Sequence, residues 1–195
     1  MPTATTRVRH DRGMPRLAPV LTNRDIPAAE LGAMRLDGEL YELAAGWCPI
    51  DELEGPAHRA AAVLGDRSPR LIAELGSAAW VWGATVALPR VDEFCVDLGA
   101  RARLPLSPLV RVRELVLDPS DRVALGAASV TSPLRTAVDL ARFRESLSTV
   151  ECEAILELAR LGGFGVEECR EVLNRRRNLP EKRRAAERLT ELLGG

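Results

Sequence analysis

The chain has 195 residues, enough for one sizeable domain or two small ones. Hydrophobic residues make up 46% and charged residues 28%, as in ordinary globular proteins, and the formal net charge of −1 gives the chain as a whole no attraction to a polyanion. No segment approaches the roughly 20 apolar residues that cross a bilayer, and the N-terminus lacks an apolar signal region, so the sequence predicts a cytoplasmic protein with no membrane partner.

The cysteines and histidines offer little for metal binding or nucleophilic catalysis. The four cysteines are widely separated: Cys48, Cys95, Cys152 and Cys169. Without a CxxC pair, and with His10 and His58 as the only histidines, the sequence predicts free thiols, no structural zinc and no cofactor. Neither histidine has a plausible nucleophile nearby in sequence, so we expect no catalytic dyad.

The N-terminal third of the chain divides into a leader and a compact unit. Residues 1–20 mix Thr, Pro and four arginines and predict a flexible, basic leader, which is either an arm that touches DNA or a start-site extension. In residues 21–64, Thr22 with Asp25 resembles a capping box that opens a first, short turn of helix. Pro27 then begins a second helix, "PAAELGAMRL". The segments "ELYEL" and "GWCPI" then predict a β-hairpin. Two short helices before a hairpin predict a degenerate winged helix-turn-helix.

Residues 65–131 favour strands. A short strand is expected in "PRLIAEL", followed by a small helix capped by Ser77 that carries Trp80 and Trp82, one in the core and the other over a seam. Three segments separated by Pro, Gly and Asp turns then predict a small, mostly antiparallel sheet. In "LVRVREL", strict alternation predicts a half-buried antiparallel strand with Arg111 and Arg113 on a basic outer face.

From residue 132 the pattern is helical, with four helices separated by Gly162-Gly163 and Asn178-Leu179-Pro180. In the first of these helices, Arg135 and Asp139 are spaced i,i+4, which predicts a weak ion pair on the exposed flank. The alternative places Arg135 on sheet carbonyls, on DNA or on a partner. The segments together predict an α+β protein with domains at 21–64 and 65–195.

A metal-dependent nuclease is the enzymatic alternative. Asp92, Glu93 and Asp97 share a predicted strand and would supply the carboxylates for a metal ion. The lysine that usually accompanies such a cluster is missing, because Lys182 is the only lysine of the chain. Solvated carboxylates at a strand end are the favoured interpretation.

The charges are unevenly distributed. Residues 174–184 carry six basic side chains against Glu181 alone, which suits phosphate binding, docking of an acidic protein or two solvated helix ends. Residues 23–66 instead contain nine acids against three bases, a local charge of −6. A local charge of this sign repels the DNA phosphate backbone, so it does not favour DNA binding by this unit.

Three segments carry a resemblance to a known family: "LTNRDIPAAELGAMRLDGELYELAAGWCPID", "GSAAWVWGA" and "RVREL…DRVALGAASVTSPLRTAVDLARF". Over roughly residues 20–190 the chain resembles the AbiEi-type antitoxins of type IV toxin–antitoxin systems. The resemblance implies an N-terminal winged helix that binds operator DNA and a C-terminal domain that acts against a nucleotidyltransferase toxin. Some relatives carry a further nuclease-like domain; because this chain ends at Gly195, we expect no endonuclease activity to carry over.

The leading interpretation is therefore a non-enzymatic, antitoxin-like transcriptional regulator that binds DNA, a cognate toxin or both. The alternative is a protein-interaction module that does not bind DNA. The residues expected to contact DNA are all basic: Arg175, Arg176, Arg177, Lys182, Arg183, Arg184, Arg111, Arg113, Arg24 and Arg35.

Overall fold

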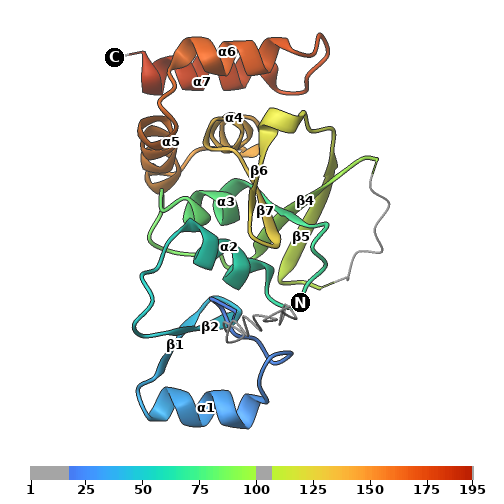
Figure 1. Cartoon of the computed structure of the whole chain (residues 1–195). Helices are drawn as coiled ribbons and strands as arrows, with labels where there is room; N and C mark the ends of the chain where they lie inside the picture. Colours follow the sequence, from blue (N-terminus) through green and yellow to red (C-terminus); the bar gives the residue numbers. More distant parts are fainter. Residues whose placement is uncertain (1–17, 100–106, 195) are drawn as a thin grey trace, which may run out of the picture.

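A computed structural model describes residues 18–99 and 107–194 and confirms the α+β class (Figure 1). The predicted leader lies almost entirely outside the described residues. The helices are α1 (Ala28–Leu36), α2 (Pro56–Leu64), α3 (Leu75–Val81), α4 (Pro133–Phe143), α5 (Thr149–Gly162), α6 (Val166–Asn174) and α7 (Lys182–Leu193), with a short 3₁₀ helix η1 (Pro119–Asp121). The strands are β1 (Leu40–Leu43), β2 (Gly46–Pro49), β3 (Ile72–Ala73), β4 (Asp92–Asp97), β5 (Val110–Leu115), β6 (Arg122–Leu125) and β7 (Ala128–Thr131). Among the described helices, none is both long and apolar enough to cross a membrane.

The main sheet has five strands in the order β5-β4-β3-β7-β6 and is mixed. Antiparallel pairs join β3 to β4 and β6 to β7, whereas β3 pairs with β7 and β4 with β5 in parallel. The expected mostly antiparallel sheet is therefore wrong. Strand β5 runs parallel to β4 at the sheet edge, with Asp92 opposite Val110 and Asp97 opposite Leu115. Strand composition alone does not distinguish these pairings.

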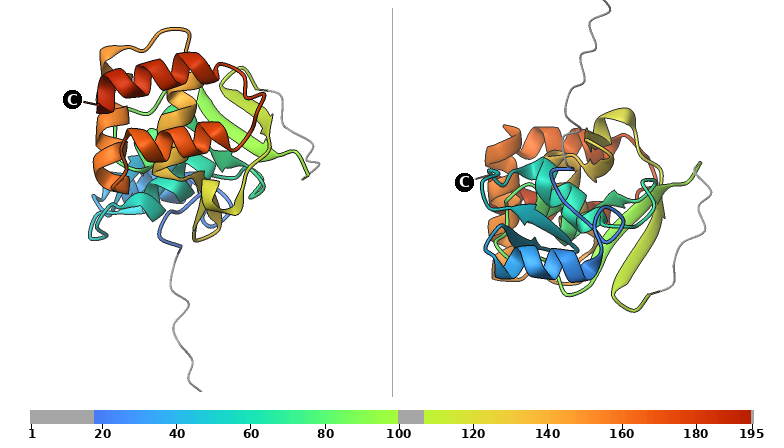
Figure 2. Two further views of the ribbon diagram at one scale, coloured as in Figure 1. Left: turned by 90° about the horizontal axis from the view of Figure 1, so that it is seen from above. Right: turned by 60° about the horizontal axis from the view of Figure 1, so that its bottom comes forward.

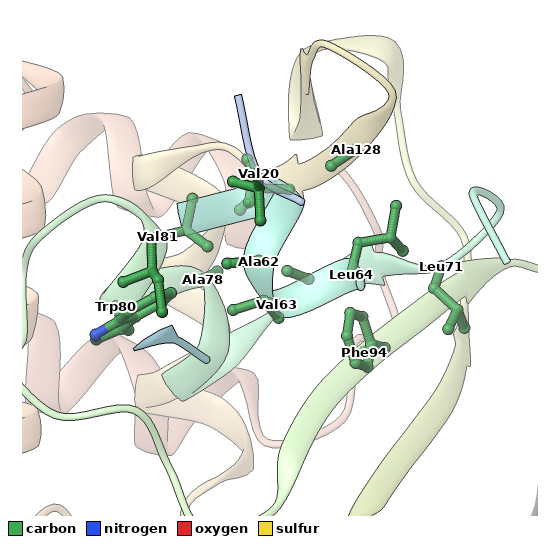
Figure 3. Packing of buried hydrophobic residues seen from close by; sticks show 14 of the residues in the cluster. Val20, Ala62, Val63, Leu64, Leu71, Ala78, Trp80, Val81, Phe94 and Ala128 are labelled. Atoms are coloured by element: carbon green, nitrogen blue, oxygen red, sulfur yellow. The ribbon is translucent and has the colours of Figure 1, made fainter. Parts of the chain in front are cut away.

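Two apolar clusters hold the sheet and helices together. One joins α2 and α3 to the sheet through residues such as Val63, Trp80 and Phe94 (Figure 3). The other joins α3 and α4 to α5, α6 and α7. Helix α4 packs against all four of these helices, and α6 and α7 lie side by side at one end of the molecule (Figure 2). All residues of α4 from Arg135 to Arg142 are therefore buried.

The tryptophans behave as predicted, but the start of α3 does not. Trp80 is buried in the first cluster, while Trp82 touches both clusters and donates from Nε1 to the carbonyl of Thr131 at 2.8 Å. Ser77 is not the cap, because α3 already begins at Leu75. The Ser77 hydroxyl instead accepts from the backbone N–H of Glu93 at 2.9 Å and ties α3 to β4.

The N-terminal unit contains one helix before its hairpin where two were expected. The Asp25 carboxylate accepts from the backbone N–H of Thr22 at 2.9 Å, but this cap closes a turn and no helix follows until α1. The β1–β2 hairpin is confirmed. Leu31 is the one buried residue of α1 and packs with Leu21 and Leu40. The winged helix-turn-helix assignment stays a prediction.

Candidate nucleic-acid interface

The ten predicted DNA-contacting residues are scattered, and the structure brings only part of the 175–184 cluster together. Arg24 pairs with Asp66 at 3.2 Å, and Arg35 lies on α1 without a partner among the described residues. Arg111 is exposed on β5, with Glu93 at 3.8 Å. Three others, described next, are used inside the molecule. The basic residues therefore do not form one continuous surface.

Arg113 does not face outward as expected. It forms a two-pronged pair with the Glu74 carboxylate, at 2.7 Å from Nε and 2.6 Å from Nη2, and its guanidinium lies 3.7 Å from the centre of the Phe143 ring. The alternation in β5 was correctly identified, but Phe143 at the end of α4 covers the outer face at this position. Planar Arg is well suited to such a combined stacking and carboxylate contact.

The predicted surface pair Arg135–Asp139 is instead buried inside a charge network. Asp139 is 0% exposed; its carboxylate accepts from Arg135 Nε at 2.7 Å and from Arg142 Nη1 at 2.8 Å. Arg135 Nη1 also donates to Asp121, at the end of η1, at 2.7 Å. The expectation was wrong because other helices and η1 cover α4, so its polar flank is almost entirely buried.

The same network fixes the α6–α7 segment onto α4. Arg175 Nη1 donates to Asp121 at 2.8 Å, and Arg142 Nε donates to the carbonyl of Pro180 at 3.2 Å. In return, Arg184 Nη2 donates to the carbonyl of Arg142 at 2.7 Å. Arg175 and Arg184, both expected on DNA, are therefore anchoring residues.

Arg188 is an anchoring residue that no pattern in the sequence singles out. Its guanidinium donates to the carbonyls of Ala141, Arg144 and Glu145 at 3.0, 2.8 and 2.6 Å. Unpaired carbonyls at a helix C-terminus carry partial negative charge, so a guanidinium there is favourable. The only sequence signal is a basic residue at helical spacing, which surface helices share.

Three cations of the cluster make no contact with the interior: Arg177 and Arg183, which are exposed, and Lys182, which is half-buried. They are here called the basic turn. Arg177 and Lys182 have no hydrogen bond or ion pair among the described residues, and Arg183 has only an exposed contact with Glu187 at 3.4 Å. The turn joins α6 to α7 at one end of the molecule (Figure 1). This is the group of predicted DNA contacts that the structure leaves available.

The carboxylates considered for a nuclease do not converge. Asp92 pairs with Arg67 at 2.7 Å, and the neighbouring Glu93 points to the other face of β4, where Arg144 holds both of its oxygens at 2.7 Å. Asp97 accepts from the backbone N–H of Gly99 at 3.3 Å. Within residues 18–99 and 107–194, His, Cys, Asp and Glu form no group of three that could hold a metal ion.

Burial perturbs the titration of the charged groups around α4. It raises the pKa of Glu74 to about 7, against the opposing effect of Arg113. Burial also lowers the pKa of Arg142, and the neighbouring cations Arg135 and Arg113 lower it further, against the opposing effect of Asp139. The lowered pKa of Arg142 therefore reflects first of all the burial of its guanidinium.

Comparisons with known proteins find one similar crystal structure to report and no matching family or curated sequence. No protein-family model matches the chain, and a search of curated proteins finds no similar sequence. A crystal structure of the RV2827C protein from Mycobacterium tuberculosis is similar at 19% sequence identity with a TM-score of 0.47. The match covers 91% of this chain and 72% of that chain.

Removing the shared acid of the network tests whether it holds the fold. We expect Asp139→Asn to lower the free energy of unfolding by about 3–5 kcal/mol, because two buried guanidiniums lose their common counter-ion. The measurement is urea unfolding at neutral pH. Glu157→Gln removes the partner of Arg160 in an exposed i,i+3 pair on α5 and changes stability little. Equal stability of the two variants would contradict the role of Asp139.

Glu74 makes stability depend on pH. Its pKa in the folded chain lies above the usual 4.5, so the folded state binds the proton more tightly. The associated stability is fully present below about pH 4.5 and is lost as the pH rises towards about 7. Across that window, we expect the unfolding free energy of the wild type to fall relative to Glu74→Gln by up to about 3 kcal/mol. The measurement is the free energy of unfolding from chemical denaturation at a series of pH values. If this free energy changed with pH in the same way in the wild type and in Glu74→Gln, the raised pKa of Glu74 would be refuted.

Proposed function

We propose that this chain is a non-enzymatic, antitoxin-like regulator that binds DNA phosphates through the basic turn. The observation that carries the proposal is a contrast within the cluster. Arg177, Lys182 and Arg183 have no buried partner, whereas Arg175 and Arg184 make internal contacts. Cations that serve no internal contact are free to neutralise phosphates. The resemblance to AbiEi-type antitoxins adds the regulatory role.

The anchoring contacts support the proposal because they preorganise the turn. Pro180 and Arg184 are hydrogen-bonded to Arg142, and Arg175 is bonded to Asp121, so both sides of the turn are tied to the core. Side chains presented from a fixed backbone lose less entropy on binding than those on a free loop. Lys182 and Arg183 also begin α7, so their spacing is set by the helix.

A protein partner is the second candidate, and the N-terminal unit favours it. Leu36 is 85% exposed, Ile50 68% and Leu53 90%, all within the stretch where acids outnumber bases. Exposed apolar residues rimmed by one sign of charge are typical of a docking surface for a protein of opposite charge. A nucleotidyltransferase-type toxin with a basic face is the partner that we propose for it.

Charge removal at the turn tests the DNA proposal. In a titration with random-sequence duplex DNA, we expect Arg177→Gln/Lys182→Gln/Arg183→Gln to reduce the slope of log affinity against log salt by about 3, because three phosphate contacts are lost. The matched control removes three exposed arginines elsewhere, Arg90→Gln/Arg160→Gln/Arg170→Gln. If the two triple variants lose affinity equally, the turn is not the interface.

Acidic substitution tests the partner surface. When the chain is coexpressed with a nucleotidyltransferase encoded beside its gene, we expect one complex on size-exclusion chromatography. Leu36→Asp/Leu53→Asp should abolish it, since a buried unpaired carboxylate at an interface is strongly unfavourable. Val86→Asp, at a fully exposed site outside the unit, should leave the complex intact. A complex that survives the double substitution would place the contact elsewhere.

A further inference from the structure

A cavity of about 240 Å³ lies between η1, α4 and the segment that joins α6 to α7. Four arginines line it, Arg135, Arg142, Arg175 and Arg176, and Phe143 and Leu179 contribute apolar wall. The exposed side chains Glu114 and Arg175 stand on its edge, so the cavity reaches the surface. It adjoins the basic turn but does not include the three residues of that turn.

Two nearly buried guanidiniums direct unused donors into this cavity. The side chains of Arg135 and Arg142 are 9% and 4% exposed, and each donates from Nε and Nη1 to the contacts already described. Their Nη2 groups have no partner among the described residues. Neither Nη2 is among the fully buried unpartnered nitrogens, which are His58 Nε2 and Arg184 Nε. Both therefore have access to solvent, and the cavity that these arginines line is the route.

The four arginines and the four acids around the cavity balance in number, but Arg176 is not paired with any of these acids. Arg135, Arg142 and Arg175 share two buried acids, Asp121 and Asp139. Arg176 adds a cation that has no partner within the described part of the chain. The remaining acids on the wall are Asp118, which already lies 3.5 Å from Arg175, and Glu114, which is exposed.

We propose that this cavity binds a phosphoryl group, with Arg142 and Arg176 as principal donors and Arg135 behind them. The free Nη2 groups of Arg135 and Arg142 and the unpaired guanidinium of Arg176 could form charge-assisted hydrogen bonds with the oxygens of a phosphoryl group. The volume suits a phosphate with a small attached body, which Phe143 and Leu179 would cover. The phosphoryl group belongs to a free metabolite or to a DNA backbone; only the second source rests on the proposed function.

Inorganic phosphate titrated into the full chain by calorimetry, at constant ionic strength set with chloride, tests the site. We expect saturable one-to-one binding with a dissociation constant of about 1 mM or tighter. Arg176→Gln, which removes no internal contact, should weaken it about tenfold. Arg142→Lys keeps the charge but removes the Nη2 donor and should weaken phosphate binding as well. Arg170→Gln, elsewhere on α6, should bind as the wild type does.

Absence of saturation up to about 10 mM phosphate, or wild-type binding by Arg176→Gln, would overturn the proposal. Competition with duplex DNA separates the two sources. Displacement of phosphate by the duplex supports a backbone phosphate, whereas uptake of phosphate by the DNA-bound chain supports a free metabolite. A chain that binds phosphate but no duplex supports the cavity site while refuting the proposed function, so the two failures are distinguishable.

Discussion

The fold depends on the pairing of Asp139 with Arg135 and Arg142 inside the helical half of the molecule. One buried carboxylate pairs with two guanidiniums, which also donate to Asp121 on η1 and to the carbonyl of Pro180 before α7. Segments that apolar packing alone would leave free to slide are thereby held in one register. Buried ion pairs contribute little net stability, but they make displaced arrangements costly because each would leave a charge unpaired.

This use of arginine explains why a count of charges misled the site prediction. Residues 174–184 carry six basic side chains, yet Arg175 and Arg184 serve as anchors, and Arg176 lies on a cavity wall. Arg113 is likewise occupied by Glu74. A guanidinium has five donors and a planar face, so it can satisfy carbonyls and carboxylates in the interior as well as phosphates outside. Amino-acid composition does not show whether a given arginine makes an internal contact or is available to a phosphate.

The α+β class, the β1–β2 hairpin and the four C-terminal helices were predicted because they depend on local signals. Ser132 caps α4, Ser148 forms a capping box at α5, and Gly163 ends α5 in the left-handed region, each as its residue type favours. The pairing of β5 with β4 was missed because strand direction follows from the route of the connection. The burial of Arg135 was missed because an i,i+4 pair looks the same on an exposed flank and on an enclosed one.

The sequence by itself determined which segments become helices and strands, and where charge accumulates, since propensity, capping and hydrophobic periodicity act over a few residues. Only the tertiary structure decided which arginines face solvent: it left Arg177 and Arg183 exposed and gave Arg113, Arg135 and Arg142 carboxylate partners within. The physical reason is that a partner such as Glu74, distant in the chain from Arg113, becomes a neighbour only when α3 and α4 pack on the sheet.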